Sequence, residues 1–171
     1  MENTVWQGKF LRMTTETIGE ITWERAYLPD GVVIFPVTAE GKILVIRERR
    51  AHENPPVRLK PVTGMLDAGS TPEENAQREL QEEIGFKATT LEKFWSYTTN
   101  GTVNSVTHFF LAKGLVPSKF TNPDGDVVEE ILALTPEEMD KKIADDEMRW
   151  GVSVMGWQRL RGLLGAQKIS L

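Results

Sequence analysis

Residues 64–86 read Gly64-Met-Leu-Asp-Ala-Gly-Ser70-Thr-Pro-Glu-Glu-Asn-Ala-Gln-Arg78-Glu79-Leu80-Gln81-Glu82-Glu83-Ile84-Gly85-Phe86. This stretch predicts a loop that leads into a short helix. Glu79 is followed by Glu82 and Glu83 at the i+3 and i+4 spacings that bring side chains to one face of a helix. Carboxylates held so close repel one another, and a hard divalent cation would offset that repulsion. We therefore predict a metal site on this helix.

Both ends of the predicted helix are marked by their residue types. Thr71 suits the N-cap, Pro72 suits the first helical position, and Glu74 completes a capping box. Gly85 suits the left-handed residue that ends a helix. Apolar residues recur every four positions between these ends and predict a buried stripe, namely Ala76, Leu80 and Ile84.

The order of residues in this stretch is more specific than its charge pattern. As a charge pattern alone it predicts a solvated helix face, with Arg78 and Glu82 as an ordinary i,i+4 pair. The order, however, resembles the signature of the Nudix hydrolases, Gly-x5-Glu-x7-Arg-Glu-U-x-Glu-Glu-x-Gly-U, in which U is apolar. Every specified position matches except one, where Ser70 replaces a glutamate. A match of this length is far more specific than a lone glycine motif.

The resemblance implies a pyrophosphatase that cleaves a nucleoside diphosphate linked to another group and uses Mg²⁺ or Mn²⁺. It implies that Glu79, Glu82 and Glu83 bind the metal and that Arg78 orients these carboxylates. The backbone carbonyl of Thr63, which stands where the family has an alanine, would be a further metal ligand. With serine in the glutamate position, we expect weaker metal binding or an altered pH dependence, but still a working site.

Composition predicts one soluble globular domain. The chain has 171 residues, of which 40% are hydrophobic and 26% charged, a net charge of −5, and no cysteine. Disulfides and thiolate metal sites are therefore excluded. Without a basic tract, a membrane-length apolar run or a signal-peptide pattern, we expect no nucleic-acid partner, no membrane association and a cytoplasmic location.

The pattern of strands and helices predicts an α/β fold. Strands are predicted within residues 3–28, at 32–37, 42–47, 88–98, 105–112 and 130–134, a proline loop at 51–58, a polar loop at 116–126, and helices after Thr135 and at 151–165. We expect a Nudix-type α/β/α sandwich with a mixed central sheet and an N-terminal antiparallel β arm. The arm would cover residues 1–28 and the hydrolase domain 29–171, with the resemblance spanning about 29–145.

Features on either side of the signature resemble the branch of the family that acts on ADP-ribose and other nucleoside diphosphate sugars. Trp23 and Glu24 precede the first core strand, as in the arm that this branch exchanges between the subunits of a homodimer. There the tryptophan stacks on the base and the glutamate bonds its edge. The alternative is that Trp23 is simply a core or interface aromatic.

The resemblance also places arginines and turn residues near the substrate. Arg49, assisted by Arg50, would hold the phosphates, because a guanidinium donates two parallel hydrogen bonds. Asn100 and Gly101 would bond the sugar, although ordinary turn chemistry explains this pair equally well. A glutamate usual in this branch is replaced by Lys60, which removes a carboxylate and adds a cation.

A general base is expected in the loop before the last core strand. Residues 122–131 carry several acids, of which Glu129 is our first choice, with Glu130 and Asp126 as alternatives. Two other functions stay open. One is a nucleotide-sugar sensor that does not cut its ligand; the other is a hydrolase of nucleoside triphosphates, dinucleoside polyphosphates or capped RNA.

Overall fold

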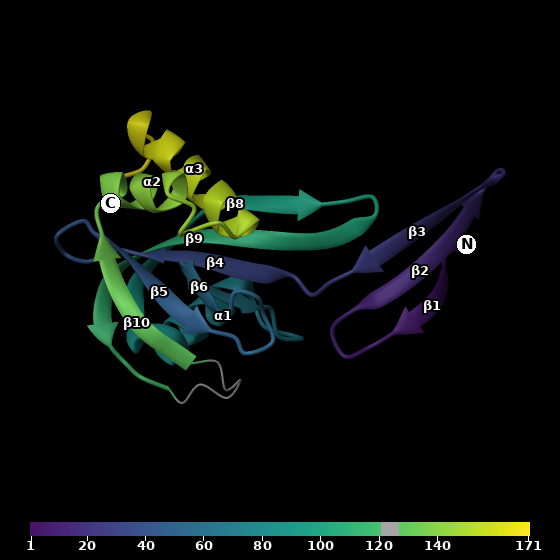
Figure 1. Ribbon diagram of the computed structural model, residues 1–171, viewed down its shortest axis with the longest axis horizontal. Helices are drawn as coiled ribbons and strands as arrows, with labels where there is room; N and C mark the ends of the chain where they lie inside the picture. Colours follow the sequence, from purple (N-terminus) through teal and green to yellow (C-terminus); the bar gives the residue numbers. More distant parts are fainter. Residues whose placement is uncertain (121–126) are drawn as a thin grey trace.

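The computed structural model describes residues 1–120 and 127–171. The elements in these residues are β1 (Asn3–Gln7), β2 (Arg12–Ile18), β3 (Ile21–Tyr27), β4 (Gly31–Pro36), β5 (Ile43–Arg49), β6 (Val57–Lys60), β7 (Val62–Met65), α1 (Pro72–Glu79), the π-helix η1 (Leu80–Ile84), β8 (Phe86–Thr99), β9 (Val103–Pro117), β10 (Val127–Leu134), α2 (Pro136–Ala144) and α3 (Gly151–Gly165). They form a body and a projecting N-terminal arm, which Figure 1 shows side by side.

The strands of the body and the arm together form two sheets. The larger has seven strands in the order β1-β2-β3-β9-β4-β7, with β8 also paired to β9, and the smaller has the order β10-β5-β6. Strand β4 runs parallel to β9 and antiparallel to β7, so the central sheet is mixed. This architecture confirms the predicted α/β sandwich with a mixed sheet.

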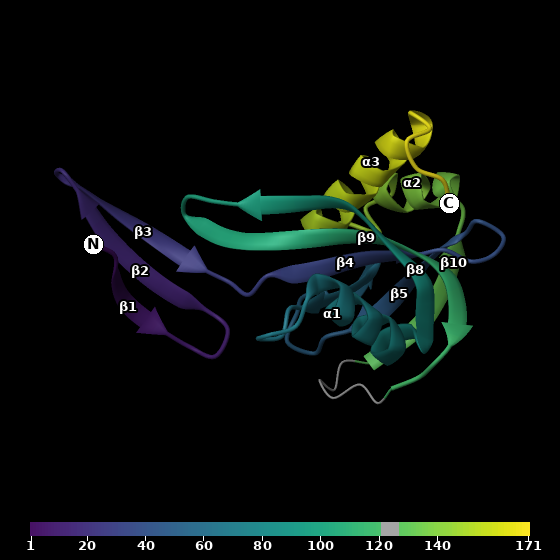
Figure 2. The same cartoon turned by 180° about the vertical axis from the view of Figure 1, so that it is seen from behind.

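Helices cover both faces of the central sheet, so β4 is buried on both sides. Its Val33 and Phe35 pack with Trp157 of α3 in one core, whereas Val32 and Ile34 pack with Leu80 in the other. Alternate residues of a strand point to opposite faces, which explains why the run is apolar throughout. In Figure 2, α1 lies on one side of β4 and α2 and α3 on the other.

Helix α1 begins as the sequence predicts but does not continue as an α-helix. The Thr71 hydroxyl accepts from the Glu74 backbone N–H, and the Glu74 carboxylate accepts from the Thr71 N–H, which completes the capping box. After Glu79 the chain widens into the π-helix η1, which ends at Gly85 with a φ of 74°. The last turn of the predicted helix therefore has a geometry that the i,i+4 spacing did not anticipate.

Several strand boundaries differ from the predictions. The proline loop predicted at 51–58 ends early, because β6 begins at Val57 and pairs antiparallel with β5. The loop predicted at 116–126 begins late, because β9 continues to Pro117 opposite Phe86 of β8. These short or extended pairings depend on a partner strand rather than on local sequence.

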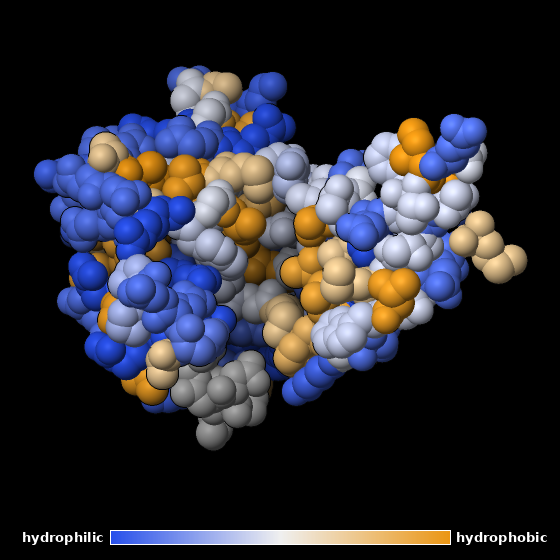
Figure 3. Space-filling view, turned by 45° about the vertical axis from the view of Figure 1, so that its right-hand side comes forward, coloured by the Kyte–Doolittle hydropathy of each residue, from blue (hydrophilic) through white to orange (hydrophobic). Residues whose placement is uncertain are grey.

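The arm is a three-stranded antiparallel sheet made of β1, β2 and β3. It joins the body through a short parallel pairing of Ala26 and Tyr27 with Val103 and Asn104 of β9. Many of its large apolar side chains are exposed, namely Val5, Trp6, Phe10, Met13, Ile18, Ile21 and Trp23. Figure 3 shows hydrophobic residues on the arm and a hollow between the arm and the body. No described helix is long and apolar enough to cross a membrane.

Candidate active site

Acidic residues from two distant parts of the sequence line one cleft. The cleft has a volume of about 950 Å³ and lies between η1, the chain just after β9, and β10. Its lining residues are Glu82, Glu83, Ile84, Gly85, Lys119, Phe120, Val127, Val128, Glu129, Glu130 and Ile131. The structure thus brings the predicted metal-binding acids Glu82 and Glu83 beside the predicted bases Glu129 and Glu130.

Glu79 lies at the end of α1 against the backbone of β7. It is mostly buried, and Arg78 Nη2 donates to its Oε1 over 2.9 Å, while Asn75 Nδ2 lies 3.3 Å from the same oxygen. Arg78 also donates to Asn75 Oδ1 over 2.7 Å and to the Asp67 carboxylate. The arginine therefore contacts the acid that the resemblance says it should orient.

Glu83 is held by residues of the β6–β7 turn. The Thr63 backbone N–H donates to its Oε2 over 3.1 Å, and Lys60 Nζ donates to its Oε1 over 2.9 Å. The same ammonium donates to Thr63 Oγ1 over 2.8 Å and lies 2.9 Å from Glu48 Oε1, in an ion pair that lacks hydrogen-bond geometry. Thr63 is thus beside Glu83, which it contacts through its N–H and not through the carbonyl that the resemblance assigns to the metal.

Burial disfavours the ionised forms of Glu79 and Glu83 and so raises their pKa values. Desolvation, reinforced by the charge of Glu83, raises the pKa of Glu79 to about 8. Desolvation also raises the pKa of Glu83 to about 7, although Lys60 opposes the shift. At Glu48, by contrast, Lys60 and Arg50 outweigh desolvation and lower the pKa. Glu79 and Glu83 are therefore acids whose ionised forms need positive charge nearby.

The predicted phosphate-binding arginine contacts the predicted base. Arg49 at the end of β5 donates from Nε to the Glu129 carboxylate of β10. Arg47, which sequence reasoning passed over, makes the matching contact with Glu130 over 3.0 Å. Arg50 donates from Nε to the buried Glu48 over 2.6 Å.

Asp126, the remaining candidate base, lies outside the described residues.

The predicted base-binding and sugar-binding residues lie elsewhere in the chain. Trp23 and Glu24 are exposed on β3 of the arm, which Figure 1 shows projecting away from α1 and β10. Asn100 and Gly101 form the turn between β8 and β9, beside the arm, where the Ala26 N–H donates to the Thr102 carbonyl over 2.7 Å. None of these four residues is among those that line the acidic cleft of the same chain.

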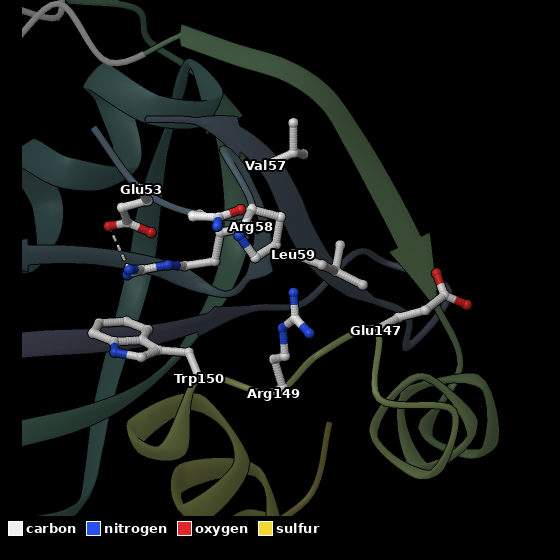
Figure 4. A pocket seen from close by; sticks show the side chains of 9 residues that line it. Glu53, Val57, Arg58, Leu59, Glu147, Arg149 and Trp150 are labelled. Carbon is white, nitrogen blue, oxygen red and sulfur yellow. Dashed lines mark hydrogen bonds and ion pairs between the residues drawn. The ribbon is translucent and has the colours of Figure 1, made fainter. Parts of the chain in front are cut away.

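A second, smaller pocket lies beside β6. It has a volume of about 260 Å³, and Figure 4 shows Arg58 between Glu53 and the Trp150 ring. The Arg58 guanidinium lies 4.6 Å from the ring centroid and is ion-paired with Glu53. No predicted site residue lines this pocket, and its central cation is already engaged within the protein.

The acidic cluster has the chemistry of a divalent-cation site, although its side chains do not converge in the structure. Among residues 1–120 and 127–171, no three acidic or histidine side chains are arranged so that they could hold one ion. Glu83 instead turns toward Lys60. Buried carboxylate oxygens with raised pKa values nevertheless fit Mg²⁺ or Mn²⁺, which prefer oxygen ligands.

Some residues in or near the cleft were not predicted from the sequence, because no motif marks them. Lys119 and Phe120 are positioned by the π-helix, since the Phe120 N–H donates to the Gln81 carbonyl over 3.2 Å and the Gln81 side chain donates to Ser118 Oγ over 2.7 Å. Glu48 was not predicted to take part in the site either, yet it is 1% exposed and contacts Lys60. The available signal was its place two residues after the apolar Ile46 in β5, because alternate residues of a strand share a face.

The fold and the acid-lined cleft define a member of a known hydrolase family. The Nudix domain model matches residues 27–151. The chain therefore belongs to the Nudix family, as the resemblance of residues 64–86 indicated.

Individual relatives agree with this assignment. An ADP-ribose pyrophosphatase of Bacillus subtilis is 33% identical over 82% of this chain and 77% of its own length. A GDP-mannose pyrophosphatase of Yersinia enterocolitica is 34% identical over 72% of this chain and 70% of its own. A methanol dehydrogenase activator of Bacillus methanolicus is 30% identical over 78% and 72%. A crystal structure of an ADP compounds hydrolase shares the fold, with a TM-score of 0.81 and 20% identity over 98% of this chain and 93% of its own.

Proposed function

We propose that the chain hydrolyses the diphosphate bond of a nucleoside diphosphate sugar, ADP-ribose or a related compound, to a nucleoside monophosphate and a sugar phosphate. The observation that carries the proposal is the cleft in which Glu82 and Glu83 of η1 face Glu129 and Glu130 of β10. Two relatives that are at least 33% identical bear the names of pyrophosphatases for ADP-ribose and GDP-mannose, which supports this substrate class.

We assign metal binding to Glu79, Glu82 and Glu83, assisted by the Thr63 carbonyl. A bound Mg²⁺ or Mn²⁺ would neutralise phosphate charge and activate water. Arg78 would keep Glu79 in place through the 2.9 Å contact that it makes.

We assign proton transfer and phosphate binding to residues of β10 and of the end of β5. Glu129 takes a proton from the attacking water, whose oxygen bonds to one phosphorus as the bridging P–O bond breaks. Arg49 binds a phosphate by exchanging part of its contact with Glu129, and Arg50, fixed on Glu48, is assigned a supporting charge there.

We further propose that the arm completes the site of a second copy. Trp23 and Glu24 lie on the arm, which projects away from the acidic cleft of its own chain, and the turn with Asn100 and Gly101 precedes the strand that pairs with the end of β3. A homodimer with exchanged arms would cover the exposed apolar side chains and place an indole over the base. Residues 1–28 would then act as the dimerisation and base-binding arm of a hydrolase domain at 29–171.

The test is a substrate panel. Purified protein with Mg²⁺ is incubated with ADP-ribose, GDP-mannose, UDP-glucose, a dinucleoside tetraphosphate and a nucleoside triphosphate, and nucleoside monophosphate is measured by chromatography. We expect product from at least one nucleotide sugar and none after chelation of the metal. Turnover of only the triphosphate or the tetraphosphate would overturn the proposed substrate class.

A nucleotide-sugar sensor is the second candidate. The Lys60 ammonium that holds Glu83 favours it, because this contact engages an acid of the metal cluster. One relative that is 30% identical bears the name methanol dehydrogenase activator, which also supports a regulatory role. A sensor would be stabilised against heat by a nucleotide sugar and would release no product.

A further inference from the structure

Lys60 is the most deeply buried charged residue beside the proposed metal cluster. Its side chain is 0% exposed, and its ammonium contacts the carboxylates of Glu48 and Glu83 and the hydroxyl of Thr63. Lysine is almost never fully buried unless it is paired, because removing an ammonium from water costs several kcal/mol. The carboxylates of Glu48 and Glu83 therefore hold the Lys60 ammonium in place.

Lys60 belongs to a small network of charges. Arg50 donates to Glu48 Oε2, and Lys60 lies between Glu48 and Glu83. Both oxygens of Glu83 are engaged, Oε1 by Lys60 and Oε2 by the Thr63 N–H. The protein itself thus offsets part of the negative charge of the cluster.

We propose that Lys60 is a positioning residue that acts as a built-in cation for the acidic cluster. It fixes the Glu83 carboxylate and supplies a positive charge that a divalent ion would otherwise supply, so this cleft binds divalent ions more weakly, or in smaller number, than it would without the lysine. The inference rests on the proposed function, because it concerns the same metal-binding acids.

The physical reason is repulsion between like charges. An ammonium within hydrogen-bond distance of Glu83 lies close to any ion that shares this acid, and such charges repel strongly where water is excluded. A purely structural role for Lys60 would lead to the opposite effect of its removal on metal binding. If the lysine only held β6 and η1 together, removing it would disorder Glu83 and weaken metal binding.

The test measures Mn²⁺ binding by electron paramagnetic resonance on metal-free, full-length protein without substrate. For Lys60→Met we expect at least about tenfold tighter Mn²⁺ binding, or one additional ion per chain, because the repelling charge is gone. Lys60→Arg keeps the charge and should match the wild type. Circular dichroism reports whether each variant folds.

A second variant covers the risk that Lys60→Met destabilises the fold, because it removes the ammonium that Glu48 and Glu83 share. Glu48→Met with Lys60→Met replaces the ion pair by apolar groups of similar size, a change that proteins often tolerate. It still removes the ammonium from Glu83, so the expected increase in Mn²⁺ binding is the same.

Each other outcome overturns the inference. Unchanged or weaker Mn²⁺ binding in the folded variants, or loss of folding in both, would make Lys60 a structural residue while the proposed function stands. If neither the wild type nor the variants bind Mn²⁺, the metal site of the proposed function fails as well.

Discussion

The Glu79 carboxylate occupies the space that a side chain at position 64 would fill. A Cβ atom added to Gly64 would lie 2.1 Å from both Cδ and Oε1 of Glu79. The first glycine of residues 64–86 is therefore required by a close approach, because it lets an acid of α1 lie against the backbone of β7.

Replacing Gly64 by alanine should displace Glu79 and reduce activity. We expect metal-dependent activity to fall by roughly 100-fold or more, the usual cost of a misplacement of about 1 Å. Activity on the best nucleotide sugar and circular dichroism provide the measurement. Gly162→Ala is the matched control, because Gly162 is exposed on α3 with nothing near its added Cβ. Full activity of Gly64→Ala would exclude a catalytic need for this close approach.

Stability of the metal-free protein should fall as pH rises from about 4.5 to about 8. The folded state holds the Glu79 proton up to a pKa of about 8, whereas the ordinary pKa of a glutamate is 4.5, so folding binds a proton in this window. Glu83 acts in the same direction. The expected loss is on the order of a few kcal/mol, measured by urea unfolding. Glu79→Gln should make the free energy of unfolding less dependent on pH. The control Glu73→Gln, at an exposed position, should leave this dependence unchanged. An unchanged pH dependence in Glu79→Gln would contradict the raised pKa of Glu79.

Glu129 and Glu130 can be separated as candidate bases. We expect Glu129→Gln to lower kcat by about 10² to 10⁴ with little change in KM, because general-base catalysis contributes that much. Glu130→Gln should lower kcat less than about tenfold, since removing a solvent-exposed partner of Arg47 changes little. Steady-state kinetics decide between them. A larger loss of kcat in Glu130→Gln than in Glu129→Gln would assign the general base to Glu130. If both variants stayed active, Asp126 would be the remaining candidate.

Complementation tests the exchanged arm. Trp23→Ala and Glu83→Gln should each be nearly inactive, but mixed dimers carry one site with an intact Glu83 and a tryptophan from the other chain. We therefore expect activity to reappear when the two variants are unfolded together and refolded. Trp6→Ala, equally exposed on the arm, should keep its own activity. A mixture that stays inactive, in a protein shown by ultracentrifugation to be dimeric, would place Trp23 at the site of its own chain.

Short-range signals in the sequence predicted the local structure well. Thr71, Pro72 and Glu74 mark the start of α1, Gly85 marks the end of the η1 turn that continues it, and the same capping residues at Thr135 mark the start of α2. These features depend on residues within one or two turns, so the sequence alone carries them.

Contacts between distant residues could not be predicted in this way. The network at Lys60 depends on the turn between β6 and β7, two four-residue strands that carry no periodicity of their own. The pairing of Arg49 with Glu129 spans 80 residues and depends on the register of β5 against β10. Sequence identified the acids of the cleft, but only the fold shows which charges already have partners.

The π-helix has a consequence for how this segment can vary. Each residue of an α-helix turns the chain by about 100°, so deleting one residue between Glu79 and Gly85 would rotate the acids on one side of the deletion relative to the other. Many substitutions in Leu80–Ile84 would leave that angle unchanged, whereas any insertion or deletion would not. Natural variation in such a helix must therefore preserve the length of this turn as well as its acids.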